Sequence, residues 1–427
     1  MWMRESVNEK VEKSFEIAQQ KYREYNIDLD KILNQLLNIS LSVHCWQGDD
    51  VGGFESPGAI LSGGGIQATG NFPGKARNIF ELQQDLEKAF SLIPGNHRVN
   101  LHAIYGDFGN RAVERNEITS EFYYRWTDWA RDQNLKIDFN CSLFSHPKAN
   151  DGFTLSSKLD DIREFWIEHV KRCRKISSEI GKELDDICIH NIWIPDGSKD
   201  IPIDRKGHRA LLRDSLDEIL KEKYTHMQDT LEGKLFGLGS EAFVVGSYDF
   251  YLSYAIANNI MLTLDTGHFH PTESVGDKLT AIIPFLKGVL LHISRGIRWD
   301  SDHVVIINDD LIQLAEEIVR SGAMDKIYLG LDYFDASINR IGAWVIGARA
   351  TQKSILYALL QPIELLQEYE ENGQYFQRLA LLEECKTLPF GTVWDYFCLE
   401  NNVPIGKEWI REIESYENSI LNTRKKS

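Results

Sequence analysis

The chain has 427 residues, of which 43% are hydrophobic and 26% charged, a composition typical of a soluble globular protein with a large core. Its net charge of −17 argues against a nucleic-acid partner, which would require a basic face, and against binding to an anionic membrane surface. The six cysteines form no C-x-x-C pair, and the sequence shows neither a signal-peptide pattern nor an apolar run of about 20 residues. We therefore expect a cytoplasmic protein with reduced thiols.

The amino-terminal part predicts two helices over residues 4–36, followed by a first strand. That strand, Ile39–Val43, is a short apolar run of the kind that is buried in a sheet covered on both faces. Next, the stretch from Gly52 to Gly74 holds eight glycines and two prolines. We expect 52–78 to be either a disordered loop or a lid over a site, and composition does not decide between the two.

Helical patterns and short strands then alternate along the chain. The further expected strands are Val99–Leu101, Lys136–Phe139, Ile187–Ile192, Leu231–Gly237, Ile260–Leu264, Val289–Leu291 and 327–332. The expected helices between them are 79–93, Glu121–Asn134, Lys158–Ile180, Ala210–Lys223, Glu273–Lys287 and 311–320. Leu231–Gly237 is the weakest of the strands, because its flanks could instead extend the preceding helix.

Eight strands that alternate with helices predict the α/β class and a (β/α)8 TIM barrel. We assign residues 1–340 to this barrel, together with its amino-terminal helices and the glycine-rich segment. Residues 341–427 show one helical pattern after another and no strand pattern. They predict an all-helical C-terminal extension that packs on its own barrel or on neighbouring subunits.

Metal-ligand residue types follow two consecutive strands. Asp265 and His268 come after Ile260–Leu264, and His292, Asp300 and Asp302 end or follow Val289–Leu291. A single Asp or His after a strand is usually a cap or loop residue, but a group of five favours a metal site. In extended backbone Asp300 and Asp302 point to the same side, which is costly unless a cation lies between them.

In a barrel, the residues at the strand ends converge on one mouth. They are Trp46, His102, Asn140, Trp193, Glu232, Lys234, Asp265, His268, His292, Asp300, Asp302 and Asp332. Oxygen and imidazole donors without thiolate suit Mn²⁺, Mg²⁺ or Co²⁺, and two divalent ions would nearly neutralise the carboxylates. Lys234 is either an ordinary surface lysine or, two residues from Glu232 on an extended strand, a cation that points into the site.

Several long stretches of the sequence resemble bacterial L-rhamnose isomerases. They include HCWQGDDVGGFE from His44, GGIQATGNFPGKARN from Gly64, LDTGHFHPTE from Leu264 and HISRGIRWDSDHVV from His292. The resemblance covers nearly the whole chain. It implies a metal-dependent (β/α)8 barrel, similar to the xylose isomerases, that assembles as a homotetramer and interconverts L-rhamnose and L-rhamnulose.

The resemblance also implies roles for individual residues. Those implied to hold a structural metal are Glu232, Asp265, His292 and Asp332. Those implied to hold a catalytic metal are His268, Asp300 and Asp302, with Asp265 as a bridge. His102, Trp193 and Lys234 match sugar-contacting positions. We expect two divalent metals per subunit, Mn²⁺ first, with Co²⁺ or Zn²⁺ able to substitute.

The implied reaction moves the C2 hydrogen to C1 as hydride and a proton from O2 to O1. Lys234 would donate a hydrogen bond to the oxygen that gains charge, and a water held by Asp300 or Asp302 could shuttle the proton. Trp46 and Trp193 could stack on the sugar or be ordinary core residues. The side chains that could enclose the 6-methyl group of L-rhamnose are Val51, Leu61, Ile66, Ile104 and Phe334.

Three alternatives compete with this hypothesis. An isomerase of the same type could prefer another aldose. A metal-dependent phosphodiesterase on the same barrel would also cluster His, Asp and Glu at strand ends, although the net charge argues against it. A non-catalytic sugar-binding protein would need neither two metals nor Lys234.

Overall fold

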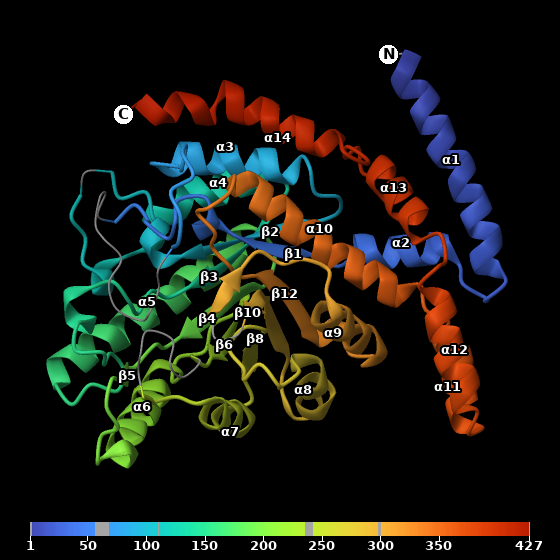
Figure 1. The fold of residues 1–427 in the computed structure, drawn as a ribbon. Helices are drawn as coiled ribbons and strands as arrows, with labels where there is room; N and C mark the ends of the chain where they lie inside the picture. Colours follow the sequence, from blue (N-terminus) through green and yellow to red (C-terminus); the bar gives the residue numbers. More distant parts are fainter. Residues whose placement is uncertain (1, 56–67, 110, 235–241, 298–299, 427) are drawn as a thin grey trace.

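Eight parallel strands close into a barrel in the computed structural model (Figure 1). The structure describes residues 2–55, 68–109, 111–234, 242–297 and 300–426, with the backbone alone for 2–7, 300–302 and 425–426. Around the barrel the order is β1 (Leu41–His44), β12 (Ile327–Leu331), β9 (Val289–Ile293), β8 (Met261–Asp265), β6 (Met227–Glu232), β4 (Cys188–Trp193), β3 (Lys136–Asn140) and β2 (His97–His102). The predicted (β/α)8 barrel is confirmed.

One helix follows each barrel strand and covers the outside of the sheet. These helices are α3 (Ile79–Phe90), α4 (Tyr124–Asp132), α5 (Asp160–Glu183), α6 (Arg205–Ile219), α7 (Tyr248–Asn258), α8 (Val275–Ile282), α9 (Asp309–Arg320) and α10 (Arg340–Leu359). The sequence analysis did not predict α7, whose start is marked by a cap: the Ser247 side chain accepts a hydrogen bond from the Phe250 amide. The helix α6 begins before the predicted Ala210, because Asp204 caps the amide of Gly207.

The strand β6 departs most from its predicted bounds. It begins at Met227, ahead of the predicted Leu231, and ends at Glu232. Its sequence MQDTLE is not an apolar run, because its polar residues Thr230 and Glu232 bond to side chains of neighbouring strands inside the barrel. An apolar-run criterion therefore missed the first half of this strand.

The barrel interior changes from apolar to polar towards the carboxyl ends of the strands. Ile189, Met261 and Leu290 form a separate apolar cluster. Two residues further along each of these strands lie Asn191, Thr263 and His292, all buried. Because side chains two residues apart share one face of a strand, this gradient places polar groups directly beneath the mouth of the barrel.

The terminal helices pack against the barrel helices and against each other. They are α1 (Trp2–Arg23), α2 (Leu29–Leu37), α11 (Ile363–Glu371), α12 (Tyr375–Cys385), α13 (Phe390–Glu400) and α14 (Glu408–Ser419). Phe15 of α1 stacks on Tyr396 of α13 with ring centroids 3.7 Å apart. Beyond α14, Arg424 pairs with Asp85 of α3 at 2.6 Å, so α14 lies along α3 (Figure 1).

Within the described part of this region, α10 supplies the eighth helix of the barrel, and α13 and α14 contact α10. The division of the chain at residues 340 and 341 stays a prediction, as does packing on a neighbouring subunit. Across the described residues, no helix combines the length and the apolar character needed to span a membrane.

Candidate metal centre and active site

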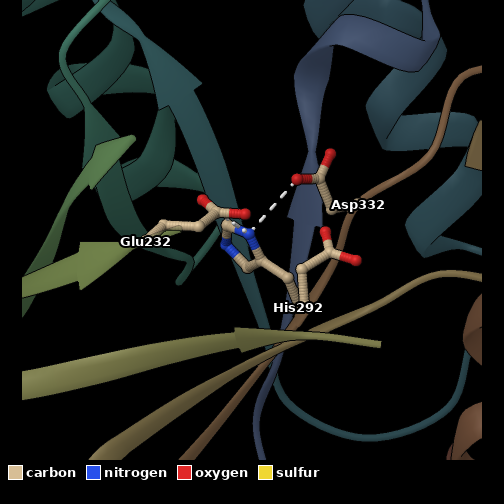
Figure 2. Close-up of side chains that lie close together, drawn as sticks. Glu232, His292 and Asp332 are labelled. Carbon is tan, nitrogen blue, oxygen red and sulfur yellow. Dashed lines mark ion pairs between the residues drawn. The ribbon is translucent and has the colours of Figure 1, made fainter. Parts of the chain in front are cut away.

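Four ligand-type side chains converge at the carboxyl ends of the strands. Glu232 ends β6, Asp265 ends β8, His292 lies on β9 and Asp332 follows β12. One ligand atom from each of the four lies within 4.8 Å of the others. Figure 2 shows His292 between Glu232 and Asp332, with its Nδ1 3.3 Å from Glu232 Oε2 and 3.2 Å from Asp332 Oδ2. The structure therefore brings together the four residues implied to hold one metal.

The donor chemistry of this cluster fits a divalent metal ion. Three carboxylates and one imidazole are hard or borderline donors, and Mn²⁺, Co²⁺ and Zn²⁺ bind such donors in proteins. Both ring nitrogens of His292 are buried, and neither makes a hydrogen bond of good geometry within the described part of the chain. A buried ring nitrogen that makes no hydrogen bond and lies beside carboxylates can coordinate a metal ion.

Burial and mutual charge shift the proton affinities within the cluster. Burial lowers the pKa of His292, but Glu232 and Asp332 outweigh it and raise that pKa well above its ordinary value. Burial raises the pKa of Asp265 to about 6, even though the charge of His268 opposes the shift. For Asp332, burial is outweighed by the neighbouring His292 ring, which lowers the pKa of Asp332 to about 2. A proton on His292 thus compensates the carboxylates, and a bound cation would take over that role.

Each carboxylate is also held by a hydrogen-bond donor. Asn191 Nδ2 donates to Glu232 Oε2 at 2.6 Å, and Trp46 Nε1 donates to Asp332 Oδ1 at 3.0 Å. Asp265 Oδ1 accepts from the Gly267 amide at 2.7 Å and from Ser294 Oγ at 3.0 Å. These bonds favour ionised carboxylates in fixed orientations. The sequence analysis placed Trp46 at the mouth as a stacking surface and did not identify it as a donor.

The residues implied to hold a second metal are only partly described. The ring of His268 lies 3.5 Å from Glu232 Oε1 through Nδ1 and 3.9 Å from Asp265 Oδ2 through Nε2, so it borders the four-residue cluster. Asp300 and Asp302 lie on β11 (Asp300–His303), which pairs antiparallel with β10 (Arg295–Ile297). Their extended backbone agrees with the sequence analysis, but their side chains lie outside the described atoms. A second metal stays a prediction.

Lys234 lies two residues beyond Glu232, just past the end of β6. Only 5% of its surface is exposed, so the alternative that Lys234 is an ordinary surface lysine is wrong. Long cationic side chains are seldom buried to this extent unless they are paired. The next residues, 235–241, lie outside the described part of the chain.

Four aromatic rings form a continuous wall beside the cluster. Trp46 meets His102 edge to face at 4.8 Å, His102 meets Phe144 at 5.3 Å and Phe144 meets Trp193 at 5.8 Å between ring centroids. Burial lowers the pKa of His102 to about 3, so this imidazole is neutral at physiological pH. Sequence reasoning missed Phe144, because a phenylalanine four residues after a strand is no different from a core residue in pattern.

The side chains expected to enclose a methyl group are placed only in part. Val51 and Ile104 are buried, whereas Phe334 is partly buried in the loop after β12. Gly53, with φ of +68°, lies over Ile104 so closely that a Cβ would approach its side chain to 2.8 Å. The Phe54 amide donates to the Ile104 carbonyl at 2.8 Å. Leu61 and Ile66 lie outside the described residues, as does most of the middle of 52–78, so the lid stays a prediction.

Known proteins resemble this chain over nearly its full length. The family model for L-rhamnose isomerase (RhaA) matches residues 9–424. The L-rhamnose isomerase of Bacteroides thetaiotaomicron is 54% identical over 416 residues, which cover 97% of this chain and 99% of that protein. Those of Rhodopirellula baltica and Listeria monocytogenes are 51% and 50% identical, with coverage of 98% and 97% of this chain and 98% and 99% of theirs. The chain therefore belongs to the L-rhamnose isomerase family.

Proposed function

We propose that this chain is an aldose–ketose isomerase that converts L-rhamnose to L-rhamnulose, the first step of L-rhamnose catabolism. One observation carries the proposal. Glu232, Asp265, His292 and Asp332 converge at the carboxyl mouth of the barrel in a chain 54% identical to a curated L-rhamnose isomerase over 97% of its length. Neither a phosphodiesterase nor a non-catalytic binding protein has comparable support.

The reaction is an internal redox exchange that needs no added oxidant or reductant. The C2 hydrogen leaves with its electron pair and bonds to C1, while the O2 proton passes to O1. C1 becomes a hydroxymethyl carbon and C2 a carbonyl carbon, so atoms and electrons balance. A divalent metal ion in the cluster would supply stabilisation of negative charge on sugar oxygens.

The side chains of the chain position and polarise the sugar. We assign to Lys234, which is buried two residues beyond Glu232, the role of donating a hydrogen bond to the oxygen that gains charge. His268, Asp300 and Asp302 are assigned to the catalytic side of the centre, where a proton must move between O2 and O1. The neutral imidazole of His102 can donate to or accept from a sugar hydroxyl.

The aromatic wall provides the apolar surface that sugar C–H groups require. Trp46 and Trp193 are each nearly buried, and their rings border the site on either side of His102 and Phe144. We assign Ile104 and Phe334 to the region that receives the 6-methyl group. Enclosing the sugar between these surfaces would exclude water during the hydride transfer.

We assign Mn²⁺ as the metal, two ions per subunit, with Co²⁺ or Zn²⁺ as substitutes. The carboxylate-rich donor set supports a hard or borderline ion. A homotetramer is supported by the exposed apolar side chains of α12, where Tyr375, Phe376 and Leu379 are 61%, 79% and 60% exposed. The cytoplasm is supported by the six cysteines, all of which are buried thiols.

The test is an assay of metal-stripped protein with a panel of aldoses, read as ketose formed. We expect no turnover in excess chelator, recovery with added Mn²⁺, and L-rhamnose as the best substrate. Glu232→Gln should lower kcat/KM by more than ~100-fold, because it removes a ligand charge. Glu87→Gln is the matched control, since Glu87 on α3 pairs with Trp129 away from the site. Full turnover in excess chelator would contradict the proposal.

A further inference from the structure

A line of three buried polar side chains runs beneath Glu232. Thr230 Oγ1 lies 2.8 Å from Thr263 Oγ1, and Thr263 Oγ1 donates to Asn191 Oδ1 at 2.9 Å. Asn191 Nδ2 in turn donates to Glu232 Oε2 at 2.6 Å. The exposed fractions of Thr230, Thr263 and Asn191 are 0%, 4% and 2%, so all three side chains are shielded from bulk solvent.

The hydrogen bonds of this line have a single consistent direction. An ionised carboxylate only accepts, so Asn191 must present its NH₂ group to Glu232 and its carbonyl oxygen to Thr263. Thr263 has one hydroxyl proton, which it gives to Asn191. Thr230 must therefore donate to Thr263, and every proton in the line points towards Glu232.

The line also connects three strands that neighbour each other in the barrel. Thr230 lies on β6, Thr263 on β8 and Asn191 on β4, while Glu232 lies on β6 two residues beyond Thr230. Asn191 pairs with Thr230 in the sheet register. Because these positions are fixed by the sheet, the amide of Asn191 has little freedom to turn away from Glu232.

Glu232 needs such support more than the other carboxylates of the cluster. Its side chain has one more rotatable bond than that of Asp265 or Asp332, so it loses more freedom when it is fixed. Asp265 is held in part by a backbone amide, whereas the described donor to Glu232 is a side chain that must itself be held. With Oε2 bonded to Asn191, the other oxygen, Oε1, faces His268 at 3.5 Å.

We propose that Thr230, Thr263 and Asn191 are positioning residues that fix the Glu232 carboxylate and so set the metal affinity of the centre. The proposal rests on the metal-dependent function proposed above. These three residues would be neither metal ligands nor sugar contacts. Their role would be to hold the carboxylate of a ligand in place. Outer hydrogen-bond partners of metal ligands typically change metal affinity by ~10–100-fold when they are lost.

Thr263→Val tests the proposal, since valine keeps the shape of threonine but cannot donate to Asn191. Metal-stripped full-length protein is titrated with Mn²⁺ by calorimetry, and the melting temperature of each metal-free variant is measured. We expect Thr263→Val to bind Mn²⁺ ~10-fold more weakly and Thr263→Ser, which keeps the hydroxyl, to bind within about threefold of the unaltered chain. At saturating Mn²⁺, turnover of L-rhamnose should recover to within about threefold, because the sugar contacts are intact.

Thr351→Val is the matched control. Thr351 on α10 is equally buried, and its hydroxyl donates to the Gly347 carbonyl at 2.9 Å within the same helix. This variant should bind Mn²⁺ like the unaltered chain. If Thr263→Val does not fold, Asn191→Ala, which removes the donor itself, replaces it with an expected loss of ~10–100-fold.

The outcomes separate this inference from the proposed function. Unchanged Mn²⁺ affinity in Thr263→Val or Asn191→Ala overturns the positioning role and leaves the function standing. Failure of the unaltered chain to bind Mn²⁺ overturns the metal-dependent function itself. Equal losses in Thr263→Ser and Thr263→Val would show that packing, and not the hydroxyl, carries the effect, and would also overturn the positioning role.

Discussion

The indole of Trp46 donates a hydrogen bond from Nε1 to Oδ1 of Asp332 at 3.0 Å. The two residues are far apart in sequence, but β1 and β12 are neighbours in the closed barrel, so both lie at the same edge of the mouth. Trp46 is buried, with 3% of its surface exposed. One side chain therefore both contributes to the aromatic wall and donates a hydrogen bond to a carboxylate of the four-residue cluster.

Replacing Trp46 with phenylalanine should separate these two contributions. Phenylalanine keeps an aromatic face but removes the N–H donor, so we expect Mn²⁺ to bind ~10-fold more weakly. Affinity is measured by titration of the metal-stripped protein. Trp129→Phe is the control, because it removes an indole bond to Glu87 away from the site. If both variants bind Mn²⁺ equally well, the bond to Asp332 has no part in metal binding.

We expect Asp49 to introduce a pH dependence of stability outside the metal centre. Burial raises its pKa to about 7, although Tyr105 Oη donates to Oδ1 at 2.6 Å and the Gly53 amide donates to Oδ2 at 2.7 Å. The folded-state pKa thus lies above the ordinary value of 3.8. For a carboxyl group shifted upwards, the unfolded state loses its proton first. The free energy of unfolding therefore falls as pH rises from about 4 to about 7 and is constant above that.

Asp49→Asn should remove this loss, because the amide stays neutral and the Tyr105 hydroxyl can reverse to accept from it. Between the two pH limits this titration changes the free energy of unfolding by up to about 4 kcal/mol, since one pKa unit corresponds to about 1.4 kcal/mol. The melting temperatures of both proteins are measured from pH 5 to pH 8. We expect the unaltered chain to lose more stability than Asp49→Asn over this range. If melting temperature changes with pH in the same way for both proteins, Asp49 either stays ionised or has the same pKa in the folded and unfolded states.

The order of the barrel strands, and of the helices between them except α7, could be predicted because it depends on local patterns. Short apolar runs such as Val289–Leu291 mark strands covered on both faces, and the polar residue at each strand end marks the mouth. Five of the residues expected there do lie together: Glu232, Asp265, His292 and Asp332 form one cluster, and His268 borders it. The barrel topology alone brings these residues together, so the predicted strand order was sufficient to predict that they lie close to one another.

Interactions inside the barrel could not be predicted in the same way. Asn191, Thr230 and Thr263 occupy positions that resemble solvent-facing residues in a half-exposed strand, and only the closed sheet shows that they face each other. Phe144 and Asp49 lie in loops, where no periodicity indicates direction. The roles of these residues depend on contacts between segments distant in sequence, and one sequence does not specify such contacts.

The proposed hydride transfer predicts where solvent hydrogen can enter the product. Glu232, Asp265 and Asp332 belong to the four-residue cluster, and their carboxylates accept hydrogen bonds from neighbouring groups. We therefore expect none of the three to act as the base that removes a proton from C2. Run in heavy water, the reaction should leave the carbon-bound positions of L-rhamnulose unlabelled. Product hydrogens are read by nuclear magnetic resonance. Substantial deuterium at C1 would instead indicate proton abstraction through an enediol.

The methyl group of L-rhamnose provides the last prediction, for which the structure offers two side chains of different character. Ile104 is buried beneath Gly53, so its substitution also loosens the start of the 52–78 segment. Phe334 is partly buried and packs at the edge of the core. Phe334→Ala is therefore the more direct test of a methyl pocket, because Ile104→Ala is expected to combine a selective loss for L-rhamnose with a loss for all sugars.

L-Mannose, which carries a hydroxyl where L-rhamnose carries hydrogen, should be a substrate with lower kcat/KM. An apolar pocket rejects an added hydroxyl only weakly, by about 1–3 kcal/mol or up to ~100-fold, because the wrong sugar leaves no buried protein group unpaired. Phe334→Ala should narrow this difference, chiefly by lowering kcat/KM for L-rhamnose. Initial rates for both sugars at saturating Mn²⁺ measure the ratio. Equal efficiency on the two sugars in the unaltered chain would mean that no side chain of this mouth recognises the methyl group, and specificity would then have to come from the ring hydroxyls.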